Sequence, residues 1–368
     1  MNLRKSDQKP LFFFFFFAIV TSKYIYTFNY IQISLNVKRN LRKSAYSRDF
    51  IDDILILLNY YGKILYKLYQ SIKERTYMNL CDPKCVRELM SVFGLTFRKE
   101  WGQNFLTDSG AVASIAESCG ANKPRTVLEI GAGAGALTRE LANRYENVIA
   151  VEIDRGLIPL LKYVLDDCKN VELVCADIMK TDLRSLLAEA FERGGVAVCA
   201  NLPYYITTPI LLSLLDSRLS FESITVMIQS EVADRLVAAP GTPDYGSITA
   251  YLGYFGVPHK LFNVKADKFL PPPKVDSTVV RIDLYKEKPY KPQNEDVFFR
   301  TLRAAFAQRR KTLPNALAAG FGELSKTQLC DAVLRSGFSA DIRGERLSTA
   351  DFVRLSDEIH GMISASPD

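Results

Sequence analysis

Short apolar runs alternate with helix-length segments through the middle of the 368-residue chain. The runs are rich in Val and Ile and span residues 126–130, 148–152, 171–175, 196–200, 224–229 and 278–284. Parallel strands that are covered on both faces have this composition. The segments between them that have helical length are 137–145, 156–166, 209–216 and 231–239. The alternation predicts an α/β fold with a doubly wound sheet, whose ligands bind at the carboxyl ends of the strands.

The pattern changes after Tyr285. The polar stretch Lys-Glu-Lys-Pro-Tyr-Lys-Pro-Gln contains two prolines and is typical of a linker. From Glu295 onward the periodicity is helical, without a strand candidate. We therefore predict a main α/β domain over residues 78–287 and a small helical domain over residues 288–368.

The first 77 residues differ in composition from the rest. They carry 17 of the 41 aromatic residues but only one of the 20 Gly and one of the 16 Pro. Their apolar run from Leu11 to Val20 is ten residues long, too short to span a bilayer. We expect residues 1–77 to be translated upstream sequence, with Met78 as the true start. A targeting or membrane-associating extension is the alternative.

Charge and cysteine content restrict the class of protein. The net charge of +6 comes from residues 1–77, because the remainder holds 34 basic and 36 acidic residues. Bulk charge therefore gives no support for nucleic-acid binding, and any RNA contact must use local basic clusters. Seven irregularly spaced Cys indicate reduced thiols in a cytosolic protein. With only two His, we expect no metal site.

A glycine-rich turn follows the first predicted strand. In Glu129-Ile-Gly-Ala-Gly-Ala-Gly-Ala-Leu, the glycines Gly131 and Gly133 allow a tight turn and a close approach to a ligand. Glu152 ends the second strand, where a carboxylate can accept hydrogen bonds from both hydroxyls of a ribose. Asp177 ends the third, where it can accept a bond from an adenine amino group or simply cap a turn. These features indicate an adenosine-containing cofactor, either NAD(P) or S-adenosylmethionine.

The fourth strand ends in Asn201-Leu-Pro-Tyr-Tyr-Ile-Thr-Thr-Pro. An adenine amino nitrogen is a poor nucleophile, because its lone pair is delocalised into the ring. The Asn201 side-chain oxygen and the Leu202 carbonyl could each accept a hydrogen bond from one N–H of this amino group. The lone pair of the amino nitrogen would then be free to attack. Pro203 would stiffen the turn, and Tyr204 could stack on a flipped base. Catalysis would then consist mainly of positioning.

Taken together, these motifs resemble the ribosomal RNA small-subunit adenine dimethyltransferase family. The similarity covers about residues 97–320 and includes Trp101-Gly-Gln-Asn-Phe-Leu, Gln229-Ser-Glu-Val-Ala-Asp-Arg-Leu and Phe269-Leu-Pro-Pro-Pro-Lys-Val-Asp-Ser. The resemblance implies a Rossmann-like class I S-adenosylmethionine methyltransferase fold with a small C-terminal helical domain. The cofactor contacts that it implies are Gln103, Asn104, Leu106, Glu129, Gly131, Gly133, Glu152, Ile153, Asp177, Ile178 and Asn201.

The same resemblance implies dimethylation of two adjacent adenosines near the 3′ end of small-subunit (16S) rRNA, coupled to subunit biogenesis. Phe269 would face Tyr204 across the target adenine, although a core Phe beside a proline turn is an equal alternative. The family carries a similar block at Arg309, Arg310 and Lys311, which would contact rRNA phosphates, with an ordinary solvated helix face as an equal alternative. Arg300, Arg303 and Lys311 fall near helical spacing, which predicts one basic face, and Arg98-Lys99 is a second basic candidate. The expected partner is the small ribosomal subunit. We expect a cytoplasmic monomer without stable membrane association.

Three alternatives stay open. The erythromycin-resistance methylases, which act on large-subunit rRNA, share the fold and the Asn-x-Pro-Tyr motif. The chain could instead be chiefly a ribosome-assembly or RNA-binding factor with secondary catalysis, although the intact Asn201, Tyr204 and Glu152 favour retained activity. An NAD-dependent dehydrogenase fits the glycine turn but leaves the Asn201 loop unexplained.

Overall fold

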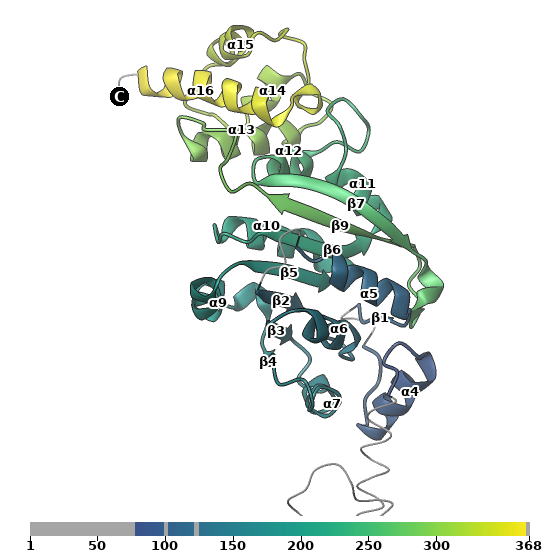
Figure 1. Cartoon of the computed structure of the whole chain (residues 1–368). Coiled ribbons are helices and arrows are strands. Elements are labelled where there is room, and N and C mark those ends of the chain that lie inside the picture. The colour runs from purple at the N-terminus through teal and green to yellow at the C-terminus, as the bar shows by residue number, and fades with distance from the viewer. Residues whose placement is uncertain (1–77, 99–101, 121–124, 366–368) are drawn as a thin grey trace, which may run out of the picture. The chain divides into compact units, whose positions relative to one another are not determined.

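The computed structural model describes residues 78–98, 102–120 and 125–365 (Figure 1). The predicted extension 1–77 lies outside the described residues, as do Lys99 and Trp101. The described residues from Asn79 onward form one compact unit.

Seven strands form one mixed sheet in the order β4-β3-β2-β5-β6-β9-β7 among the described residues. They are β2 (Thr126–Ile130), β3 (Asn147–Glu152), β4 (Val171–Cys175), β5 (Val196–Asn201), β6 (Ser223–Gln229), β7 (Gly256–Val264) and β9 (Ser277–Leu284). The first five in spatial order pair in parallel. All six predicted strands are thus confirmed.

Two predictions about strand environment were wrong. The strand β9 runs antiparallel to both β6 and β7, so its apolar composition reflects burial between two neighbours rather than parallel pairing. The strand β4 lies at the sheet edge and is largely only half-buried. The strand β7, at the other edge of the sheet, was missed because Pro258 and the polar His259 and Lys260 interrupt its apolar pattern.

The four predicted helices form within two or three residues of their expected bounds, as α6 (Ala136–Arg144), α7 (Leu157–Val164), α10 (Thr207–Asp216) and α11 (Ser230–Leu236). Further helices are α4 (Pro83–Val92), α5 (Ser109–Ser118), α8 (Leu183–Leu186), α9 (Ala188–Arg193) and α12 (Ser247–Gly253). Asp82 and Asp108 begin α4 and α5 by accepting bonds from backbone N–H groups of the first turn.

The chain from residue 295 to 365 is helical, as predicted. It forms α13 (Glu295–Ala307), α14 (Leu313–Leu317), α15 (Lys326–Arg335) and α16 (Thr349–Ala365), which gather beside α12 and beyond the β7 edge in Figure 1. One apolar cluster runs from sheet residues such as Leu128 to Phe298 and Phe352 in these helices. The proposed boundary between residues 287 and 288 stays a prediction.

The chain order of the strands determines where a ligand can bind. From β2 the sheet grows through β3 and β4 on one side, and β5 then returns to the other side of β2. The carboxyl ends of β2 and β5 therefore meet at the point where strand order reverses, which is the usual ligand position in such sheets. A separate two-stranded ribbon pairs β1 (Phe105–Leu106) with β8 (Phe269–Leu270). None of the helices formed by the described residues has the length and apolarity to cross a membrane.

Candidate active site

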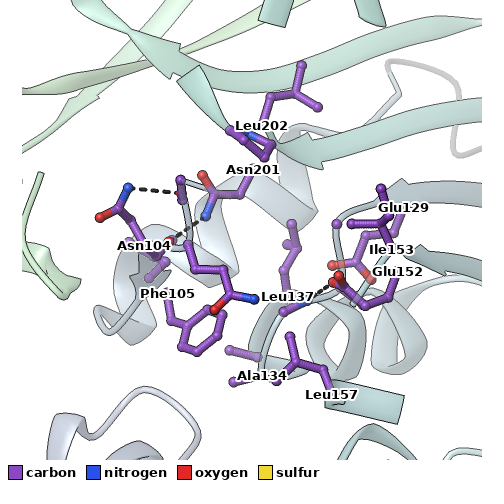
Figure 2. A pocket seen from close by; sticks show the side chains of 18 of the residues that line it. Asn104, Phe105, Glu129, Ala134, Leu137, Glu152, Ile153, Leu157, Asn201 and Leu202 are labelled. Carbon is purple, nitrogen blue, oxygen red and sulfur yellow. Dashed lines mark hydrogen bonds between the residues drawn. The ribbon is translucent and has the colours of Figure 1, made fainter. Parts of the chain in front are cut away.

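A pocket opens at the carboxyl ends of β2, β3 and β5 (Figure 2). Its lining comes from four segments of chain, namely 102–106, 129–137, 152–157 and 201–205. Figure 2 shows Asn104 and Asn201 on one side of the pocket, with Glu129 and Glu152 on the other. The structure thus brings most of the predicted cofactor and catalytic residues together.

The glycine turn has the backbone that its sequence predicts. Gly131 and Gly133 have φ values of +82° and +58°, which L side chains rarely adopt. A Cβ on Gly133 would lie 3.1 Å from the Phe105 ring. The Glu152 carboxylate accepts bonds from the backbone N–H of Gly133 at 2.9 Å and of Asp154 at 2.8 Å. Glu152 therefore fixes the turn against the end of β3, and each oxygen keeps a further lone pair for a ligand hydroxyl.

Glu129 is an unusual buried acid. Its side chain is 1 % exposed, and neither carboxyl oxygen has a hydrogen-bond partner among the described residues. Burial raises the pKa of Glu129 to about 8, and the negative charge of Glu152 adds to the rise, which the nearby Thr138 hydroxyl only partly offsets. Burial also raises the pKa of Glu152, against the lowering effect of its backbone hydrogen bonds. The pocket therefore holds two carboxyl groups whose ionisation a cationic ligand would favour.

The segment before β1 is tied to the end of β3. The Gln103 amide donates to the Asp154 carboxylate at 2.9 Å and accepts from the backbone N–H of Arg98 at 2.9 Å. Asp154 is 3 % exposed and also accepts a bond from the backbone N–H of Gly156. The Asn104 side chain donates to the Gly102 carbonyl at 3.0 Å. Gln103 and Asn104 therefore shape this wall of the pocket through contacts within the protein.

The catalytic loop predicted at the end of β5 is held from outside the loop. The Nδ2 of Asn201 donates to the main-chain carbonyl of Asn104 at 3.2 Å, which orients the amide (Figure 2). The Leu202 side chain is buried, and the backbone N–H of Leu202 donates to the main-chain carbonyl of Met227 at 3.2 Å. Pro203 precedes a single 3-10 turn, in which the Tyr204 hydroxyl lies 2.7 Å from the Ser277 hydroxyl.

Three predicted residues are not among those that line the pocket. Asp177 caps the short turn after β4 by accepting from the Met179 N–H at 3.0 Å, and it pairs with Lys180 at 3.6 Å. Ile178 packs against the apolar cluster. Phe269 is 4 % exposed in β8, where it pairs with Leu106. Asp177 thus makes the capping contact that was the alternative to its predicted cofactor role. Phe269 likewise has the core position that was the alternative to stacking on the target base.

The prediction of one basic helical face was wrong, because α13 ends at Ala307 and Lys311 lies in the following turn. Arg300 pairs with Glu323 at 2.7 Å and donates to the Gly320 carbonyl. Arg309 donates to the carbonyls of residues 243 and 245 at 3.0 and 2.8 Å and pairs with Glu345 at 3.5 Å. The side chains of Arg310 and Lys311 are exposed.

Sequence reasoning missed several residues of this site. Asp154, Phe105, Leu137 and Tyr205 contribute to the pocket or to its supports, and Tyr205 is 64 % exposed at its edge. Asp154 follows Glu152 by two residues. A second carboxylate so close to the predicted ribose-binding Glu152 was the available signal. No group of three or more metal-ligating side chains occurs in the part of the chain that the structure describes.

Comparison with known proteins places this chain in a family. The model of the family described as ribosomal RNA adenine dimethylase matches residues 94–359. The chain belongs to this family. It is therefore an rRNA adenine methyltransferase, and membership favours methyl transfer over the dehydrogenase reading of the glycine turn.

Relatives agree with the family assignment. The ribosomal RNA small subunit methyltransferase A of Pelotomaculum thermopropionicum is 45 % identical over 285 residues, covering 76 % of this chain and 96 % of its own. That of Alkaliphilus oremlandii is 39 % identical over 280 residues, covering 76 % of this chain and 98 % of its own.

Two solved structures have the same fold. A dimethyladenosine transferase from Plasmodium falciparum has a TM-score of 0.58 at 27 % identity, covering 68 % of this chain and 95 % of its own. The 23S rRNA methyltransferase ErmE has a TM-score of 0.54 at 25 % identity, covering 70 % and 100 %. The fold is thus that of the class I S-adenosylmethionine methyltransferases, as predicted.

Proposed function

We propose that this enzyme uses S-adenosylmethionine to dimethylate the 6-amino groups of two adjacent adenosines near the 3′ end of small-subunit (16S) rRNA. The observation that carries the proposal is the Asn201 amide, whose Nδ2 is engaged by the Asn104 carbonyl at 3.2 Å at the pocket edge. An amide fixed through its nitrogen presents its oxygen as an acceptor, which is what an adenine amino group requires.

The pocket fits the cofactor in its donor set. S-adenosylmethionine is cationic, and the buried Glu129 carboxyl has two oxygens without a hydrogen-bond partner among the described residues. Glu152 would hold the ribose, while Gly131 and Gly133 would admit the cofactor close to the backbone. Gln103, Asn104, Leu106 and Ile153 line the same pocket. When bound, the cofactor supplies an electrophilic methyl group.

The catalytic loop would act on the target base by positioning. The Asn201 Oδ1 and the Leu202 carbonyl would each accept a hydrogen bond from one N–H of the adenine amino group. This leaves the lone pair of the amino nitrogen available. Tyr204 would stack on the base, a contact worth about 1–3 kcal/mol. The methylated nitrogen is acidic enough to release its proton to water, so no strong general base is needed. Catalysis would come from alignment of the reactants.

The choice of small-subunit rRNA is supported by the relatives named above, two of which are small subunit methyltransferases at 39 % and 45 % identity. Arg310 and Lys311 are exposed and would contact RNA phosphates. We further propose that the enzyme acts as a monomer in the cytoplasm, where ribosomal subunits mature.

The test is to incubate the purified chain with labelled S-adenosylmethionine and small subunits that lack the 3′-end adenine methylation. We expect dimethyladenosine in the rRNA with the parent protein and little label with Asn201→Ala. Label in naked large-subunit RNA instead would favour the activity of the erythromycin-resistance enzymes. Subunit binding without any label would favour an assembly factor.

A further inference from the structure

A hydroxyl pair links the catalytic loop to the antiparallel side of the sheet. The Tyr204 Oη and the Ser277 Oγ lie 2.7 Å apart, although 73 residues separate them in the chain. Either oxygen can be the donor. Tyr204 comes from the turn after β5, whereas Ser277 is the first residue of β9.

Ser277 is a fixed anchor. It is fully buried, and its strand lies between two others, so that its backbone is in register with Gln229 of β6 and Val264 of β7. The residues on both sides are held as well. The Asp276 carboxylate accepts from the Ala266 N–H at 3.0 Å, and the Thr278 hydroxyl bonds the Ser230 hydroxyl at 2.9 Å.

Tyr204 has fewer restraints of its own. It lies in a single 3-10 turn, Tyr204–Ile206, and its side chain is only half-buried. Among the described residues, Ser277 is its one side-chain hydrogen-bond partner. Burial raises the pKa of Tyr204, so the phenol keeps its proton and can take part in this bond at neutral pH. The orientation of the ring therefore depends on the hydroxyl pair.

We propose that Ser277 is a positioning residue, which holds the Tyr204 ring in the orientation needed to stack on the target adenine. The inference rests on the proposed function, because it assigns Ser277 a part in forming the base site. Ser277 itself touches no reacting atom. Its effect passes through the phenol of Tyr204, and the rigid strand β9 supplies the fixed reference point.

The kinetic test compares Ser277→Ala, Tyr204→Phe and the double variant. Each single variant should lower the single-turnover rate of methyl transfer about fivefold to tenfold, the size expected for one neutral hydrogen bond. The KM for S-adenosylmethionine should stay unchanged. The double variant should be no slower than the slower single variant, since both substitutions remove the same bond. Ser277→Thr should retain most of the rate, because it keeps a hydroxyl.

Ser223→Ala is the matched control. Ser223 lies in the neighbouring strand β6, is also buried, and has a hydroxyl without a hydrogen-bond partner among the described residues. Its loss should leave the rate unchanged. Independent effects of Ser277→Ala and Tyr204→Phe that multiply in the double variant would overturn the proposal, as would a rate for Ser277→Ala equal to that of the parent.

A second readout separates this inference from the assigned reaction. In protein labelled with 13C-tyrosine, the ring signals absent from Tyr204→Phe identify Tyr204. Ser277→Ala should shift or broaden these signals, whereas Ser223→Ala should not. A shift in a protein that methylates no small subunits would support the contact and reject the proposed function. Unchanged signals in an active enzyme would reject the inference alone.

Discussion

Asn201 donates its side-chain N–H to the main-chain carbonyl of Asn104, a residue 97 positions earlier, at 3.2 Å. The proposed catalytic amide is therefore oriented by the segment 102–106, which forms one wall of the pocket. Asn201→Ala should lower methyl transfer about 100-fold, because it removes the acceptor oxygen that would align the adenine amino group. The melting temperature should change little.

The control for Asn201 is Asn315→Ala, which removes an amide that bonds Thr312 in the helical region. This variant should keep the parent rate. Equal losses of rate in the two variants would show that the Asn201 amide has no special part in the reaction.

Glu129 should make stability depend on pH. Because its pKa is raised from 4.5 to about 8, the folded state binds more protons than the unfolded state between these values. The free energy of unfolding should therefore fall as pH rises from about 4.5 towards 8. Glu129→Gln should flatten this dependence and stabilise the protein near pH 8. Urea unfolding at several pH values checks both points, and parallel slopes for the two proteins would contradict the assignment.

Gly133 should not tolerate a side chain. With φ at +58° and the Phe105 ring 3.1 Å from an added Cβ, Gly133→Ala should cost about 1–2 kcal/mol of stability and weaken cofactor binding. Gly361→Ala in α16 is the comparison, because its Cβ would meet nothing within 4 Å. That variant should gain about 0.5–1 kcal/mol. Thermal unfolding and calorimetric titration with S-adenosylmethionine measure the two effects.

Arg309 and Arg310 should behave differently although they are neighbours. Arg309 holds two loop carbonyls and Glu345, so Arg309→Ala should lower the melting temperature. Arg310→Ala should leave it unchanged and reduce the slope of log affinity against log salt for RNA by about 1. Thermal unfolding and RNA binding over a range of salt concentrations separate the two roles. A melting temperature lowered only by Arg310→Ala would reverse the assignment.

The sequence by itself determined the strand–helix alternation, the glycine turn and the Asn-Leu-Pro-Tyr loop. Each of these is a local pattern: buried strands require apolar runs, and a turn at positive φ requires glycine. The six strands and four helices formed where these patterns indicated them. The polar strand β7 escaped, because an edge strand needs no continuous apolar run.

Only the tertiary structure decided which long-range partners hold the site. The Asn104 carbonyl on Asn201, the Ser277 hydroxyl beside Tyr204 and the Asp154 carboxylate on Gln103 join segments that are 97, 73 and 51 residues apart. Such contacts depend on strand order and register, which leave no local pattern in the sequence. The Glu129 oxygens, which have no hydrogen-bond partner within the described part of the chain, likewise follow from what packs around them. This packing rather than the residue type sets the pKa of Glu129.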